Sequence, residues 1–470
     1  MRFNYRFGLL VRLASMIALV VPLPLRAQAD PGPSDASTTS AQAHAGAASP
    51  PLDDVRPVLQ GQLRNGLRYV VVPRRTNEPG VGLHMQVTGG FLAERRPGER
   101  GLAHLVEHLA FHSATRAAPE DVQRFRTVGM PLTLPEPAGG TTTWRESDYY
   151  VVSRTNDPAD IETLLGLFRE VAGELIFRAD AVDEQRAEVA REMADKRLGN
   201  ESSARFIAAV APGSPTDVIQ AQNSDDVATA SLDTIRALYH RLYRPETTSV
   251  VIVGDVDPRQ MAAAIERRFG DWRGVGPPPG RVAVPTFEAR RIAPFSHSAL
   301  AEGPRSATIT SVAPLPPPPR TRRLQAEGML MDMLAVRAVG RRLAQTQAPG
   351  PPGKYGMFIE NGEHGHRLMI FWDRFEPGGW RPAVEGLRRT VCDLAVQGLS
   401  EREWGDAKQR VIEELELQGR HMPNSMLAGR MADALAIGRD PIPPAELLRR
   451  ARTWLPTVAA STMNRWWRRQ

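Results

Sequence analysis

The chain has 470 residues, of which 42% are hydrophobic, and a formal net charge of +6 at pH 7. A chain of this length and composition can bury the cores of two or three domains, which excludes a fibrous or largely disordered protein. The one cysteine, Cys392, excludes an internal disulfide, so packing has to supply the stability.

Residues 1–29 have the pattern of a secretory signal peptide, which we expect to be cleaved after Ala29. Three arginines precede the apolar run Leu13–Leu25, which contains two prolines and is shorter than the ~20 residues that a membrane span needs. The four arginines of this segment account for four positive charges, so the mature chain carries +2. A charge so close to zero argues against nucleic-acid binding. We therefore expect a periplasmic or secreted protein with no stable membrane span after processing.

Residues 30–57 are rich in proline, alanine, serine and threonine without an apolar period, which is typical of a flexible leader. Residues 58–272 follow as the first expected domain. Its apolar runs predict strands at Tyr69–Val72, Val81–Gly89, Tyr149–Ser153 and Ser249–Gly254, and helices at Pro158–Phe177, Ala181–Leu198, Leu232–Leu242 and Pro258–Phe269. The glycine- and proline-rich stretch Gly270–Pro285 then indicates a linker.

Residues 286–470 form the second expected domain. Its pattern predicts helices at Arg322–Gln345, Trp380–Gln397 and Glu401–Gln418, and a strand at Arg367–Asp373. Strands and helices mix in both halves, which favours the α+β class. We expect two similar, α/β-sandwich-like domains, with the mixed sheet of the metallopeptidase half packed against helices.

The strongest chemical signal is the spacing H-x-x-E-H, formed by His104, Glu107 and His108. On a helix, residues i and i+4 lie on one face with i+3 beside them, so two imidazoles and one carboxylate converge. Neutral imidazole nitrogens are good zinc ligands, and a catalytic zinc usually has three protein ligands and a water. A carboxylate beside such a water can take its proton. The pattern predicts a Zn²⁺ site in which Glu107 is the base.

A third ligand is needed, and the predicted helix Ala181–Leu198 offers three carboxylates. Glu184, Glu188 and Glu192 follow at i, i+4 and i+8 and so share one face of the helix. Spacing alone does not choose among them, and a solvated acidic stripe has the same pattern.

These residues resemble the pitrilysin or insulinase-type (M16) zinc metallopeptidases, which carry the inverted motif H-x-x-E-H. Further likeness lies in LRNGLRYVVVP, VTGGFLAE, RGLAHLVEHLAFHS and LYRPETTSVVIVGDVD. It covers residues 58–272 well and the second domain more loosely, where GRRLAQ and MLAGRMADALAIG are most similar to bacterial periplasmic members. The resemblance implies a zinc endopeptidase that hydrolyses extended peptides or small unfolded proteins.

The resemblance also chooses the third ligand. The family's E-R-x-V-V-x-x-E helix is similar to Gln185–Glu192, which places Glu192 on the metal-binding glutamate. Gln185 stands where the family has a supporting glutamate, so one charge behind the ligands is missing. The separation between His108 and Glu192 is several residues longer than expected, and a proline-rich insertion at Met130–Gly139 can absorb the excess.

A family strand, N-A-x-T, that pairs with the backbone of the peptide is similar to Gly140, Thr141, Thr142 and Thr143. We expect Gly140, Thr141 and Thr142 to bind substrate through main-chain hydrogen bonds, which do not need the asparagine side chain that Gly140 lacks. His112, close to the motif, is expected to be a surface or packing residue rather than a fourth ligand.

Family enzymes enclose the substrate between two similar halves, and 470 residues have length for one half. The resemblance therefore implies a second M16-like half as partner, in a homodimer or a heterodimer. A rival interpretation is a non-catalytic peptide-binding or assembly subunit of the same fold, favoured by Gln185 and Gly140. The complete H-x-x-E-H argues against it, because loss of catalysis usually removes those residues first.

Overall fold

The computed structural model describes residues 56–76, 78–135, 139–210, 225–278, 280, 305–314, 317, 319–346, 354–361 and 366–467. The expected signal peptide, most of the expected leader and the end of the expected linker lie outside these residues. Helices and strands mix along the described chain, which confirms the predicted α+β class. No helix within these ranges combines the length and the hydropathy of a membrane span.

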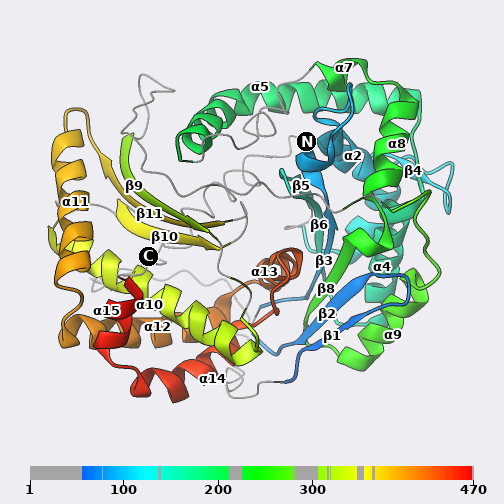
Figure 1. Cartoon of the computed structure of the whole chain (residues 1–470). Coiled ribbons are helices and arrows are strands. Elements are labelled where there is room, and N and C mark those ends of the chain that lie inside the picture. The colour runs from blue at the N-terminus through cyan, green and yellow to red at the C-terminus, as the bar shows by residue number, and fades with distance from the viewer. Residues whose placement is uncertain are drawn as a thin grey trace, which may run out of the picture.

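A six-stranded mixed sheet forms the centre of the N-terminal part (Figure 1). Its strands lie in the order β1 (Leu59–Gln62), β2 (Arg68–Pro73), β8 (Thr248–Gly254), β3 (Val81–Thr88), β6 (Glu146–Ser153) and β5 (Gly139–Thr142). β2 and β8 run parallel, and the other neighbours are antiparallel. β8 is buried along its whole length, as expected for an inner strand with both faces covered. Among the described residues β5 pairs with β6 alone, so it is an outer strand of this sheet.

Helices cover one face of this sheet: α2 (Leu102–Phe111), α4 (Pro158–Gly173) and α9 (Pro258–Phe269), with α5 (Ala179–Val210) and α8 (Leu232–Leu242) packed on α2. α4 and α9 begin alike, since Asp157 and Asp257 each cap the first turn and a proline follows. Strand residues such as Leu83 and Met85 join helix residues such as Leu105 in one buried core. This core fixes α2 against the sheet.

The other face of the sheet is covered by α13 (Asn424–Ala436), a helix from the C-terminal part of the chain. Valines of β2 and β8 pack against apolar residues of α13, namely Val70, Val72, Val251, Val253, Leu427, Ala428, Met431 and Ala432. Asn424 donates a hydrogen bond of 2.9 Å to the carbonyl oxygen of Gly80. A Cβ at Gly82 would lie 2.5 Å from the backbone of Asn424, so this close approach requires glycine.

The C-terminal part is built on an antiparallel three-stranded sheet in the order β10 (Tyr355–Asn361), β11 (His366–Phe375) and β9 (Arg305–Pro314). Its helices are α10 (Arg322–Thr346), α11 (Trp380–Val396), α12 (Glu401–His421), α14 (Pro444–Trp454) and α15 (Ala460–Trp467). α12 starts with a capping box formed by Ser400 and Glu403. The buried side chains of these elements form a second large core, separate from that of the N-terminal part.

The short elements are β4 (Ala114–Thr115), β7 (Leu175–Ile176), α3 (Met130–Leu132) and α7 (Asp226–Thr229), with single turns at Gly90–Ala93, Phe125–Gly129, Pro245–Thr247 and Leu455–Thr457. The predicted helix Pro158–Phe177 is wrong at its end, because α4 stops at Gly173 and the next residues pair with β4. The predicted helices Leu232–Leu242 and Pro258–Phe269 match α8 and α9 at both ends.

Candidate metal centre

Helix α2 carries His104, Glu107 and His108, and its first turn is fixed by a partly buried carboxylate. The helix follows Gly101, whose φ of +83° suits glycine. Glu94 accepts hydrogen bonds from the backbone N–H groups of Gly101 at 2.8 Å and Ala103 at 2.7 Å. Burial raises the pKa of Glu94 to about 8, while these two bonds favour its charged form. The cap determines where His104, the next residue, lies.

Glu192 of α5 lies beside the two histidines. Its Oε2 is 3.7 Å from Nε2 of His104, and its Oε1 is 3.8 Å from Nε2 of His108. One ligand atom from each residue can be chosen so that all three lie within 4.8 Å of one another. Across the described part of the chain, no other group of three or more His, Cys, Asp or Glu side chains is placed to hold a metal. The structure thus brings together the three residues that the sequence predicts as ligands.

The other two carboxylates on the acidic face of α5 do not join this group. Glu184 is exposed, and Glu188 forms an ion pair with Arg191. Arg186 donates to two carbonyl oxygens at α7 and just beyond its end, and this contact holds the N-terminal part of α5 in place. Of the three carboxylates, Glu192 is the one that lies beside the histidines of α2.

Hydrogen bonds behind the imidazoles orient the atoms that face Glu192. Nδ1 of His108 lies 3.3 Å from Oε1 of Gln185, and an amide oxygen can only accept. Nδ1 then carries the proton and Nε2 keeps its lone pair toward the metal group. Gln185, predicted to support the ligands, is buried there. His112 instead bonds the carbonyl oxygen of His108 at 3.0 Å, which is a packing contact at the end of α2.

Burial also sets the charge of these groups. It lowers the pKa of His104 and of His108, so both imidazoles are neutral at neutral pH, the form that binds metals. Burial raises the pKa of Glu107 to about 8, and the nearby carboxylate of Glu192 adds to the shift. A cluster of buried carboxylates and neutral imidazoles favours a bound cation, whose charge would offset the cost of burying the carboxylates.

The donor set fits zinc. Two imidazole nitrogens and one carboxylate are a common catalytic set, and bonds of ~2.0–2.2 Å to a tetrahedral ion put ligand atoms roughly 3.4 Å apart. The 3.7 and 3.8 Å between facing atoms here are close to that spacing. Nδ1 of His104 is buried and has no hydrogen-bond partner among the described residues. Lys196 donates to Oε2 of Glu192 at 2.6 Å, so the group already has a cationic neighbour. Sequence reasoning missed Lys196, although its i+4 spacing from Glu192 is the signal.

The edge strand β5 lies beside Glu107. Oε2 of Glu107 accepts a hydrogen bond of 3.1 Å from the hydroxyl of Thr142, and it is 3.9 Å from Nε2 of His104. Gly140 also lies beside Glu107. Thr141, between Gly140 and Thr142, points to the other face of the sheet, because side chains alternate along a strand. The three residues predicted to bind substrate therefore form an outer strand next to the metal group.

Comparison with known families matches most of this region. A family model described as "Insulinase (Peptidase family M16)" matches residues 69–205, and one described as "Peptidase M16 inactive domain" matches residues 229–344. The first match contains His104, Glu107, His108 and Glu192.

Individual relatives agree. The "Probable zinc protease PqqL" of Escherichia coli is 29% identical over 213 residues, which are 44% of this chain and 22% of that protein. Among solved structures, the first half of the periplasmic protease PqqL from Escherichia coli is similar with a TM-score of 0.68 at 20% identity, covering 90% of both chains. The structure of PqqL itself gives a TM-score of 0.67 at 19% identity, covering 90% of this chain and 47% of PqqL. The chain thus spans about half the length of PqqL in the structural alignment and a smaller share in the sequence alignment.

Proposed function

This chain belongs to the insulinase family of M16 peptidases, and from that premise we propose that it is a zinc-dependent endopeptidase acting on extended peptides or small unfolded proteins. The observation that carries the proposal is the convergence of His104, His108 and Glu192 with Glu107 beside them. The relatives named as zinc proteases support the same chemistry at the level of the family.

In this proposal His104 and His108 hold the ion through Nε2, and Glu192 holds it through a carboxylate oxygen. When bound, zinc supplies a Lewis acid that polarises the scissile carbonyl and acidifies a water. Glu107 is the general base, which takes the proton of that water and passes it to the leaving amine. Gln185 orients His108 from behind, with an amide in place of the family's carboxylate.

The peptide is proposed to bind as an extra strand on the free edge of β5. Main-chain groups of Gly140, Thr141 and Thr142 would bond the peptide backbone, a mode that tolerates varied side chains and suits unfolded substrates. The edge runs past Glu107, so a peptide bound there lies close to the proposed base.

We also propose that residues 58–272 form the zinc-binding domain and residues 286–470 an M16-like second domain. Because the chain is similar to the first half of PqqL, a second half of the same fold is expected to face the metal group, as a homodimer or heterodimer. The expected signal peptide 1–29, with cleavage after Ala29, leads us to propose a periplasmic or secreted location; PqqL of Escherichia coli is described as periplasmic.

The test is metal analysis of the purified chain together with hydrolysis of a mixed peptide pool, read by mass spectrometry. We expect about one zinc per chain and cleavage that Glu107→Gln abolishes while the zinc stays, because the base is lost and the ligands remain. His108→Ala should lose the zinc itself. Zinc binding without hydrolysis, with the proposed second half also present, would favour the rival interpretation of a non-catalytic peptide-binding subunit.

A further inference from the structure

Glu107 lies in a space that exists because Gly140 has no side chain. A Cβ built on Gly140 would lie 2.7 Å from Oε1 and 2.9 Å from Cγ of Glu107, and 3.1 Å from the carbonyl oxygen of Asp148. Distances below 3.0 Å force something to move, and the carboxylate is the end of a flexible side chain. Any larger residue at position 140 would therefore displace Glu107 before it displaced the strand.

The hydroxyl of Thr142, two residues further along the same face of β5, holds the other oxygen of Glu107. It donates to Oε2 of Glu107 at 3.1 Å and lies 3.2 Å from the hydroxyl of Ser147 on β6. Both threonine and serine side chains are buried. Since Thr142 uses its one proton on the carboxylate, it has to accept from Ser147.

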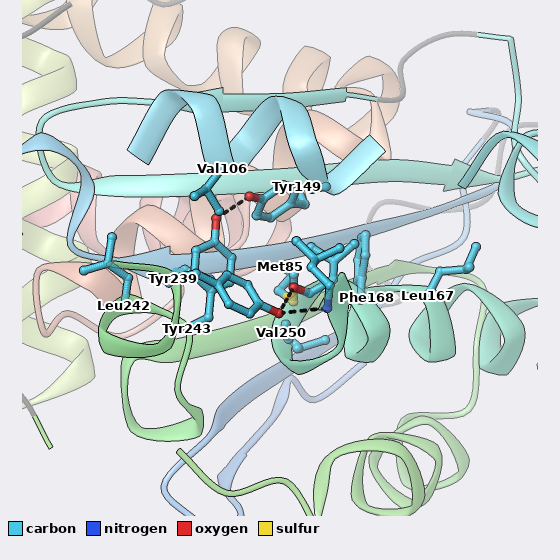
Figure 2. Packing of buried hydrophobic residues seen from close by; sticks show 14 of the residues in the cluster. Met85, Val106, Tyr149, Leu167, Phe168, Tyr239, Leu242, Tyr243 and Val250 are labelled. Carbon is cyan, nitrogen blue, oxygen red and sulfur yellow. Dashed lines mark hydrogen bonds between the residues drawn. The ribbon is translucent and has the colours of Figure 1, made fainter. Parts of the chain in front are cut away.

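Two tyrosine hydroxyls lie in the core of the N-terminal part. The hydroxyl of Tyr243 contacts that of Tyr149 beneath α2 (Figure 2). Because Thr142 accepts from Ser147, the direction of both bonds is fixed by the carboxylate: Ser147 donates to Thr142 and Thr142 donates to Glu107. The hydroxyls of Thr142 on β5 and Ser147 on β6 thus support one oxygen of Glu107.

We propose that β5 positions the base: Gly140 leaves the space for the Glu107 carboxylate, and Thr142, backed by Ser147, holds it there. The proposal rests on the proposed function, in which Glu107 is the general base. It makes Gly140 and Thr142 positioning residues in addition to parts of the peptide-binding edge. The strand that takes the peptide would then also set where the base lies, so substrate and base share one rigid support.

The test compares crystal structures, zinc content and steady-state kinetics of three variants. Thr142→Val should lower kcat about 10- to 100-fold with KM within about 2-fold, because displacement of a base by ~1 Å has that effect. Thr142→Ser should restore most of kcat, since it keeps the hydroxyl. Gly140→Ala should move the Glu107 carboxylate away from β5 in the crystal and lower kcat similarly. Zinc content should stay unchanged in all three.

Matched controls exist in the same sheet and core. Thr115→Val removes a buried threonine hydroxyl that donates to Glu170 at 2.7 Å, away from the metal group. Gly61→Ala, on the opposite edge strand β1, adds a Cβ whose three nearest atoms belong to the ring and hydroxyl of Tyr69. Both should keep the wild-type kcat and the wild-type position of Glu107.

The proposal is overturned if Glu107 keeps its position in Gly140→Ala and Thr142→Val, or if both variants keep the wild-type kcat. If Thr142→Val fails to fold, Gly140→Ala and Ser147→Ala carry the same decision. A wild-type protein that cleaves no peptide would refute the proposed function alone, because the crystallographic displacement of Glu107 is measured without activity.

Discussion

Lys196 donates to Glu192 at 2.6 Å, so the carboxylate expected to hold the metal has a cation one helical turn away. The ammonium competes with the ion for Oε2 of Glu192 and repels a divalent cation nearby. Lys196→Met should therefore tighten zinc binding on the order of tenfold, measured by competition with a chromophoric chelator. Arg191→Met is the control, since Arg191 pairs with Glu188 and is exposed. Unchanged zinc binding in Lys196→Met would show that the lysine has no net effect on the ion, and weaker binding would show that it supports the site; either result contradicts the prediction.

Among the carboxylates of α5, Glu192→Gln should weaken zinc binding most, because it removes a ligand. Glu184→Gln and Glu188→Gln should leave the dissociation constant nearly unchanged, since Glu184 is exposed and Glu188 is paired elsewhere. The dissociation constants of the three variants give the order directly. Loss of zinc in Glu184→Gln with retention in Glu192→Gln would contradict the ligand assignment.

Gln185→Leu should weaken zinc binding about 10-fold or more, a usual cost of removing a group that orients a ligating histidine. The amide oxygen fixes the proton of His108 on Nδ1, and leucine leaves that nitrogen unpaired. Gln185→Glu should reverse the sign and tighten binding, because a carboxylate makes the imidazole a better donor. Gln325→Leu is the matched control: Gln325 is also buried and hydrogen-bonded, at Asp440 in the C-terminal part. If Gln185→Leu and Gln185→Glu bind zinc with the wild-type affinity, Gln185 does not support the metal ligands.

Glu94 should make stability depend on pH. Burial raises its pKa to about 8 in the folded chain, above the ordinary 4.5, so unfolding releases its proton between these values. The contribution of this raised pKa to the free energy of unfolding is fully present below about pH 4.5, falls as the pH rises, and is gone above about pH 8. The variant Glu94→Gln has no carboxyl at this position, so its free energy of unfolding lacks this pH-dependent contribution.

Urea unfolding of both metal-free proteins at several pH values measures the effect. The wild-type free energy of unfolding, minus that of Glu94→Gln, should decrease steadily from pH 5 to pH 8. A difference that stays constant over this range would mean that Glu94 is ionised in the folded chain throughout.

Local pattern was enough to predict α2 and the pairing of His104 with His108, because helical spacing alone puts them on one face. Glu192 needed the family resemblance, since Glu184 and Glu188 share its face of the helix and only the placement of α5 along α2 decides which of them meets the histidines. Arg186 holds α5 by donating to carbonyl oxygens 41 and 44 residues later, and no local pattern contains such a contact.

The contacts around Glu107 were beyond prediction for a similar reason. Thr142 was predicted to be a strand residue, but its hydrogen bond to Glu107 depends on how α2 packs against β5. Ser147 carries no sequence signal, because serine is ordinary in a strand. Helix α13 was not among the helices predicted from the sequence, and its place on the N-terminal sheet depends on contacts between distant parts of the chain.

That place gives the protein an unusual order of assembly. Asn424 meets the carbonyl of Gly80 344 residues earlier in the chain, so the valine face of β2 and β8 stays bare until nearly the whole polypeptide is available. Closing so long a loop is slow, and until it closes the exposed valines can associate with other unfolded chains and cause aggregation. The yield of folding should thus be limited by the docking of α13 rather than by the metal group. We expect the chain to need a chaperone that binds the exposed valines until synthesis has reached residue 436, the end of α13.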